Sequence, residues 1–241
     1  HRLGNAGFEG GLWTALRMSE LIRLRNQATL DYWQLADRVV VLANWIGQIL
    51  RRNGVPMEKL FLSRHGLAQP IPSSSGRPTP RTAADPLRLA FLGRMERIKG
   101  ADLLIGALRQ MPKANLTLDL YGIVQGDGSQ TYQTALQTAA SGDARIRFLP
   151  PLPGEAVIEQ LQTYDALLVP SQGFETGPLV VLEAFAAGIP VVGSNLGGIA
   201  EWVTHEANGL LVSPFDDVNT WTDTLHRLSA DDSLRPRLAQ G

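Results

Sequence analysis

Short apolar runs alternate with longer segments of helical periodicity over the second half of the chain. Short apolar runs bounded by Gly, Pro or Asn are typical of buried strands in a parallel sheet. Such runs lie at residues 87–92, 116–121, 145–149, 166–169, 190–192 and 209–212, and helical patterns separate them. The alternation predicts an α/β fold built on a Rossmann-like, doubly wound parallel sheet.

The first part of the chain has a different pattern. Residues 9–36 place apolar side chains at helical spacing, which favours one or two packing helices over a helix that lies on a membrane surface. A strand is expected at 38–42, a helix at 45–52 capped by Asn44, and a short strand at 60–62. Residues 69–86, rich in Pro and Ser, indicate a linker. We therefore predict two domains, 1–68 and 87–241.

The stretch 166–192 is a strand, a loop, a helix and a second strand. We expect the helix over 179–187, with Pro178 at its first position and Gly188 after its end. In a doubly wound sheet ligands bind beyond the carboxyl ends of the strands, and the free N–H groups of a helix start favour a phosphate there. Glu175 precedes this helix and Glu183 lies within it. A carboxylate beside a phosphate would accept hydrogen bonds from sugar hydroxyls, whereas a buried Glu183 would need a partner.

Residues 175–192 read ETGPLVVLEAFAAGIPVV. This stretch resembles the Glu-x7-Glu motif of the retaining glycosyltransferases of family 4 (glycosyl transferases group 1), which have the GT-B fold. The resemblance implies that Glu175 is the catalytic carboxylate at the donor sugar and that Glu183 binds the ribose. It also implies that Gly177, Pro178, Leu179 and Val180 contact the donor diphosphate. The alternative is a surface Glu and a helix Glu without function.

A second motif of that family is a Gly-Arg turn followed by Lys-Gly after the first strand of the donor domain. Here the motif falls on residues 93–100, so the resemblance implies that Arg94 and Lys99 clamp the diphosphate. Arg can bind two oxygens at once, and Lys adds a compact charge. The alternative is a solvated basic loop. The family also places a glycine loop near the base, which implies base contacts from Gly122, Ile123 and Leu149.

The resemblance covers residues 37–241 and implies that 87–241 is the nucleotide-sugar donor domain. Residues 1–68 then correspond to the last part of an N-terminal, acceptor-side domain. The family's N-terminal glycine loop and active-site His are not in this sequence, and Gly173-Phe174 departs from the usual order before the first Glu. We therefore expect a chain that binds donor without transferring sugar. His65, Gly197, Gly198 and Glu201 are interpreted as structural.

Composition limits the remaining possibilities. The chain of 241 residues carries a net charge of −1, which does not suggest a nucleic-acid partner, and it contains no cysteine. No apolar run approaches the ~18 residues of a transmembrane segment. The sequence contains no Asp-x-Asp motif and no cluster of His residues, so it gives no sign of a metal site. The resemblance implies a metal-independent reaction that retains the anomeric configuration and uses no cofactor.

The expected function is transfer of a sugar from a nucleotide-diphosphate sugar to a hydroxyl of a glycan, a lipid-linked acceptor or a small molecule. The enzyme would serve polysaccharide or glycoconjugate biosynthesis, in the cytoplasm or peripherally at the inner membrane face. Two alternatives stay open. One is a sugar-nucleotide epimerase or glycan phosphorylase of the same fold, and the other is a non-catalytic nucleotide-sugar binding module.

Overall fold

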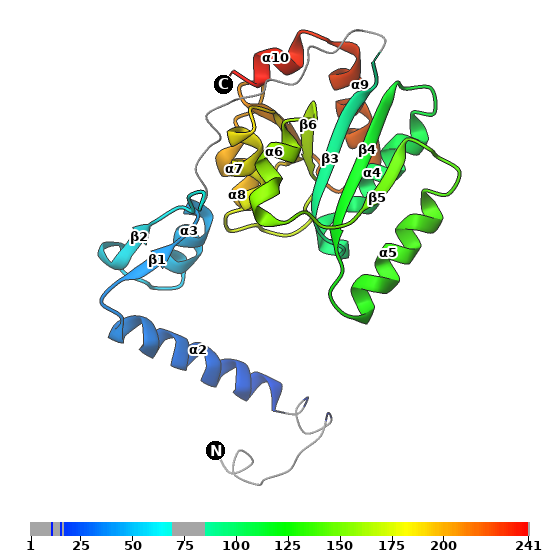
Figure 1. The fold of residues 1–241 in the computed structure, drawn as a ribbon. Helices are drawn as coiled ribbons and strands as arrows, with labels where there is room; N and C mark the ends of the chain where they lie inside the picture. Colours follow the sequence, from blue (N-terminus) through cyan, green and yellow to red (C-terminus); the bar gives the residue numbers. More distant parts are fainter. Residues whose placement is uncertain (1–10, 12–14, 16, 69–84, 241) are drawn as a thin grey trace. The chain divides into compact units, whose positions relative to one another are not determined.

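The computed structural model describes residues 11, 15, 17–68 and 85–240, which divide into two compact units, His1–Ser63 and Arg64–Gly241 (Figure 1). Most of the predicted linker, 69–84, lies outside the described residues, as do residues 9, 10, 12–14 and 16 of the first predicted helical segment. In the described ranges, no helix combines the length and apolar character needed to cross a membrane.

The first unit is a small α/β element. Its order is α2 (Met18–Leu35), β1 (Val39–Val41), α3 (Asn44–Arg52), a 3-10 turn at Met57–Lys59 and β2 (Leu60–Leu62). The two strands pair in parallel over a core that contains Val39, Val41 and Val55. The predicted cap of α3 is wrong by one position: Asn44 is the first helical residue, and Ala43 occupies the cap without a side-chain hydrogen bond.

Helix α2 does not bury the face that its periodicity predicted. None of its residues is buried, although Trp33 packs partly against the small core. Its large apolar side chains are at least 37% exposed, namely Met18, Leu21, Ile22, Leu24, Leu30, Tyr32 and Leu35. The periodicity is present, but the described part of the first unit is too small to cover it.

The second unit is a six-stranded parallel sheet in the order β5-β4-β3-β6-β7-β8, which confirms the predicted fold class. Its strands are β3 (Leu87–Arg94), β4 (Leu116–Ile123), β5 (Ile146–Leu149), β6 (Ala166–Val169), β7 (Val191–Ser194) and β8 (Gly209–Val212). From β3 the chain adds strands outward in one direction, and from β6 it adds them in the other. The order therefore reverses between β3 and β6, and such a switch point is where ligands bind in open α/β sheets.

Helices cover both faces of this sheet, as Figure 1 shows. One core forms against α4 (Ala101–Gln110), α5 (Asp127–Ala139), α9 (Val218–Ala230) and α10 (Leu234–Leu238). The other forms against α6 (Val157–Leu161), α7 (Leu179–Ala186) and α8 (Gly197–Trp202). The structure therefore confirms that these apolar strands are buried, since a layer of helices covers each face of the sheet.

Two predicted boundaries differ from the structure in ways that affect the site. Strands β3 and β4 continue two residues beyond the predicted ends, to Arg94 and Ile123, because Gly93 and Gly122 pair in the ladder. Glycine gives no strand signal, so the extension was not visible in the pattern. Before α6 the chain forms a 3-10 turn, Gly154–Ala156.

A buried carboxylate ties β4 to its neighbours. Asp119 is 2% exposed, and its two oxygens each accept a 2.6 Å hydrogen bond from Arg147 on β5. The hydroxyl of Tyr164 also donates to Asp119, at 2.6 Å, and lies 2.7 Å from the hydroxyl of Tyr121. Burial and the bond to Asp119 raise the pKa of Tyr164, so it stays a neutral donor.

We expect Asp119→Ala to lower the free energy of unfolding of the second unit by about 2–3 kcal/mol, because it leaves the buried hydroxyl of Tyr164 without its acceptor. Urea denaturation followed by fluorescence measures the change. Asp223→Ala, which alters an exposed Asp on α9, is the control and should stay within about 0.5 kcal/mol of the parent. Equal stability of the two variants would contradict this role of Asp119.

Candidate functional site

Two loops meet at the switch point. One follows β3 and runs from Met95 to Gly100, and the other follows β6 and runs from Pro170 to Pro178. The backbone N–H of Gln172 donates to the carbonyl of Ile98 at 2.8 Å. A side chain at Gly173 would come within 2.5 Å of the Ile98 side chain. The two loops are therefore locked together by backbone bonding and close packing.

Gly100 is the tightest point of this contact. A Cβ atom at this position would lie 2.1 Å from the carbonyl oxygen of Pro170, and the residue has φ +71°. Both the space and the left-handed backbone require glycine. The contact between the loops thus explains why the Lys-Gly pair of the sequence motif has glycine at residue 100.

The same contact brings two of the predicted site residues together. The Nζ atom of Lys99 lies 2.5 Å from Oε1 of Glu175, and both side chains are mostly covered, at 22% and 21% exposure. The hydroxyl of Ser171 donates to the same oxygen at 2.7 Å. The carbonyl of Glu175 accepts from the N–H of Gly198 at 2.7 Å, and Gly198 has no room for a Cβ against it. The Gly-Gly turn at the start of α8 thus supports the Glu175 backbone.

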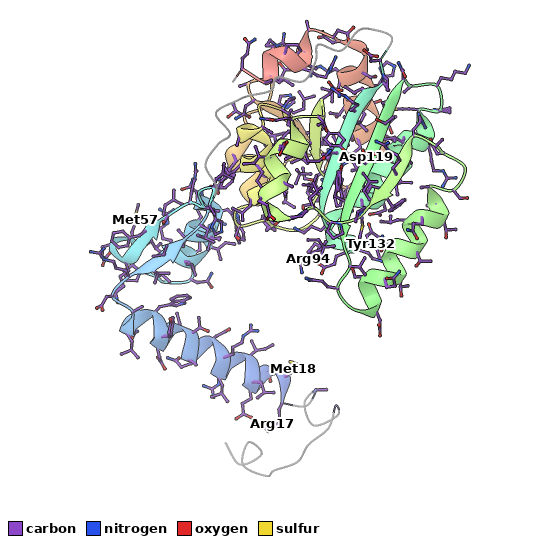
Figure 2. All side chains as sticks on the ribbon, in the orientation of Figure 1. Arg17, Met18, Met57, Arg94, Asp119 and Tyr132 are labelled. Atoms are coloured by element: carbon purple, nitrogen blue, oxygen red, sulfur yellow. The ribbon has the colours of Figure 1, made fainter. Side chains whose placement is uncertain are left out.

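Arg94 ends β3 at the same edge of the sheet, where Figure 2 labels it. Its side chain is 49% exposed and pairs with Glu96 at 2.9 Å. The register sets Arg94 beside Ile123, and Gly93 beside Gly122. Leu149, the last residue of β5, pairs with Tyr121. The residues predicted near the base therefore line the carboxyl ends of β4 and β5, next to Arg94.

Helix α7 begins four residues after Glu175. Pro178 is its N-cap rather than its first residue, and the helix starts at Leu179. The N–H of Val181 donates to the carbonyl of Pro178 at 3.0 Å, so the N–H groups that this helix start offers to an anion are those of Leu179 and Val180. Against Gly177 lies the imidazole of His65, whose Cδ2 atom would be 2.6 Å from a Cβ there. That packing contact agrees with the structural interpretation of His65.

Glu183 is the fifth residue of α7, one turn after its start, and is half-buried. No hydrogen bond or ion pair to its carboxylate comes from the part of the chain that the structure describes. Burial therefore raises its pKa above the ordinary value of 4.5. The oxygens of this desolvated carboxylate can therefore accept hydrogen bonds from hydroxyl groups of a ligand.

Beyond Arg94, the loops after β3 and β4 enclose a hollow of about 540 Å³. The guanidinium of Arg97 lies 5.6 Å from the ring centre of Tyr132, and the Tyr132 hydroxyl donates to Asp102 at 2.6 Å. Figure 2 labels Tyr132 on the same side of the sheet as Arg94. Among the described residues, no group of three His, Cys, Asp or Glu side chains could hold a metal ion.

The sequence patterns did not identify Ser171 or Glu96, although each contacts a predicted site residue. A Ser directly after the Pro that ends β6 was a usable signal, because that position opens the ligand-binding edge. Glu96 lies two residues from Arg94, a spacing that gives no regular pattern in a loop.

Comparison with known proteins decides the family. The model of the family described as Glycosyl transferases group 1 matches residues 77–241, which is more than half of the chain. The chain belongs to the glycosyl transferases group 1.

Its relatives in this family include two named D-inositol 3-phosphate glycosyltransferases. The one from Corynebacterium efficiens is 37% identical over 158 residues, which cover 63% of this chain and 37% of the relative. The one from Xylanimonas cellulosilytica is 30% identical over 206 residues, which cover 80% of this chain and 48% of the relative. The chain thus spans less than half the length of these relatives.

Solved structures confirm the fold. Sucrose-phosphate synthase from Thermosynechococcus elongatus matches with a TM-score of 0.74 at 27% identity, over 90% of this chain and 55% of that one. HepE from Anabaena, solved with UDP and glucose, matches with a TM-score of 0.71 at 22% identity, over 86% of this chain and 57% of that one. The chain therefore shares the arrangement of strands and helices of these GT-B structures.

We expect Gly100→Ala to lower the free energy of unfolding by at least about 2 kcal/mol, because the new methyl group meets backbone and the φ angle is left-handed. Thermal denaturation measures the loss. Gly128→Ala, on the first turn of α5 with nothing within 4 Å, is the control and should be neutral or slightly stabilising. A Gly100→Ala protein as stable as the parent would show that the two loops are not locked.

We expect Glu183→Gln to stabilise the chain at neutral pH. The folded-state pKa of Glu183 is raised, so the unfolded chain holds fewer protons above pH 4.5 and stability falls as pH rises towards and through the folded pKa. The Gln variant lacks this loss, so its advantage should be absent below pH 4.5 and complete at pH 7.5.

Melting curves over this pH range measure the difference between variant and parent. Glu159→Gln, which changes an exposed Glu on α6, should show no such pH-dependent gain. A Glu183→Gln protein that is less stable than the parent at pH 7.5 would indicate a partner for the carboxylate.

Proposed function

We propose that this chain is the donor-binding part of a retaining glycosyltransferase that uses a nucleotide-diphosphate sugar. The observation that carries the proposal is the Lys99–Glu175 pair at the switch point, beside the start of α7. A cation, a helix N-terminus and a carboxylate at one place suit a ligand with a diphosphate and a hydroxyl-rich group joined together.

Each predicted site residue has a role in this proposal. Arg94 and Lys99 bind the diphosphate with the backbone N–H groups at Gly177 and the α7 start. Glu175, next to Lys99, accepts hydrogen bonds from the sugar and acts at the reacting centre. Glu183, desolvated and one turn further along α7, accepts the two ribose hydroxyls. The base lies along Gly122, Ile123 and Leu149.

Countercharge for the diphosphate comes from the protein itself in this proposal. Arg94, Lys99 and the dipole of α7 supply positive potential, so we propose a metal-independent reaction without a cofactor. The two cations are engaged by Glu96 and Glu175 in the structure, and the diphosphate would exchange with these carboxylates.

For the acceptor, we propose a hydroxyl of a glycan, a lipid-linked acceptor or a small molecule. Two relatives carry D-inositol 3-phosphate in their names, which supports a polyol acceptor as the first to test. Polysaccharide or glycoconjugate synthesis at the cytoplasmic side of a membrane, or in the cytoplasm, agrees with this chemistry.

Arg94→Ala and Lys99→Ala should each weaken binding of the nucleoside diphosphate about 10- to 100-fold, because each removes a charged hydrogen-bond donor from it. Calorimetry with UDP, GDP and ADP measures the affinities. Arg109→Ala is the matched control, since this exposed Arg lies in the last turn of α4, at the opposite edge of the sheet. Excess EDTA should change none of the affinities. Unchanged binding by Lys99→Ala, or a loss in EDTA that Mg²⁺ restores, would contradict the proposal.

Isotope-labelled nucleotide sugar, incubated with this chain and candidate acceptors, should give no glycosylated product. Transfer needs the acceptor held against the anomeric carbon, and such orientation is worth about 7–11 kcal/mol in rate. The full-length protein should form product with retained anomeric configuration, as read by NMR.

Other outcomes of this assay identify the alternatives. An epimerised nucleotide sugar would indicate an epimerase, and phosphate-dependent cleavage of a glycan would indicate a phosphorylase of the same fold. Donor binding without any turnover by the full-length protein would indicate a binding module. Rapid transfer by the 241-residue chain would contradict the assignment of the acceptor side to another part of the protein.

A further inference from the structure

Ser171 contacts Glu175 in a way that the sequence motifs do not explain. It is the second residue after β6 and is only 2% exposed. Its hydroxyl donates a 2.7 Å hydrogen bond to Oε1 of Glu175, the same oxygen that Lys99 approaches. One carboxylate oxygen is thus shared by the long side chain of Lys99 and the short, buried side chain of Ser171.

These two partners respond differently when a diphosphate arrives. The ammonium of Lys99 would move towards the phosphate oxygens, which carry more charge than a single carboxylate. The hydroxyl of Ser171 is neutral, so the charge of the diphosphate does not draw it away from Glu175. Its hydrogen bond would persist and would hold the carboxylate while the cation is engaged elsewhere.

The backbone around Ser171 is fixed on both sides. The preceding carbonyl, of Pro170, packs where a Cβ of Gly100 would be, and the following N–H, of Gln172, donates to Ile98. A serine side chain has one rotatable bond between this backbone and its oxygen. The hydroxyl is therefore preorganised, as a group that orients a catalytic side chain must be.

We propose that Ser171 is a positioning residue, which keeps the Glu175 carboxylate directed at the donor sugar after Lys99 has turned to the diphosphate. The inference rests on the proposed function. It separates the two halves of the donor: Lys99 serves the diphosphate, and Ser171 serves the sugar through Glu175.

The chain offers a matched control. Ser194 ends β7, the strand beside β6, and is fully buried. Its hydroxyl has no hydrogen-bond partner among the described residues. Ser194→Ala therefore deletes the same atom from a neighbouring strand end without touching Glu175.

The test compares UDP-glucose, UDP-N-acetylglucosamine, GDP-mannose and ADP-glucose with their plain nucleoside diphosphates by calorimetry on this chain. With the donor that the parent binds best, Ser171→Ala should weaken the nucleotide sugar about three- to tenfold. It should change affinity for the matching plain diphosphate by less than about twofold. Ser171→Thr, which keeps the hydroxyl, should restore the nucleotide-sugar affinity, and Ser194→Ala should match the parent on both ligands.

A second comparison separates positioning from general support of the loop. In a Glu175→Ala background, which removes the oxygen that Ser171 contacts, Ser171→Ala should have less than about a twofold further effect, because its contribution passes through the carboxylate. Equal losses for both ligands, no loss for either, or full additivity with Glu175→Ala would overturn the role of Ser171 while leaving the proposed function intact. If the parent binds none of the nucleotide sugars, the proposed function fails, and this inference fails with it.

Discussion

The reversal of strand order between β3 and β6 is the constraint on which the site depends. It places two loops side by side that are separated by about seventy residues of chain, and their backbones then interlock at Gly100 and Pro170. Lys99 and Glu175 face one another because of this contact rather than because of any local pattern. A side chain larger than hydrogen at residue 100 would separate them.

The charges at this edge are arranged so that each proposed ligand-binding cation has an internal partner. Lys99 pairs with Glu175, and Arg94 pairs with Glu96. Such pairs avoid an uncompensated charge in a partly desolvated place, and in the proposed function the diphosphate replaces the carboxylates as partner of the cations. The carboxylate of Glu183, by contrast, has no such partner among the described residues, and its burial alone raises its pKa. The proposed function accounts for this costly burial by giving the carboxylate the two ribose hydroxyls as partners.

Much of this arrangement was predictable from the sequence, because it depends on local signals. The limits of β2, β6 and β8 follow from apolar periodicity and from Gly and Pro near their ends, and the structure confirms them. The family resemblance correctly identified the group 1 glycosyltransferases from the motifs around Arg94, Lys99, Glu175 and Glu183.

What the sequence did not show depends on contacts between distant segments. The support of Glu175 by Gly198 and the packing of Met95 against Gly122 each join segments that only the fold brings together, and the hydrogen bond from Ser171 depends on the conformation of a loop that has no regular pattern. The exposed face of α2 is a different case. Its periodicity predicted a buried apolar face, but periodicity does not identify the surface that packs against that face.

The most direct test of this account is a structure of the chain with the nucleotide sugar that it binds best. The account predicts the diphosphate at the α7 start with Lys99 on its oxygens, the ribose on Glu183, and the sugar on Glu175, which still accepts from Ser171. A nucleotide bound elsewhere, such as in the hollow beside Arg97 and Tyr132, with the Lys99–Glu175 pair undisturbed, would contradict it.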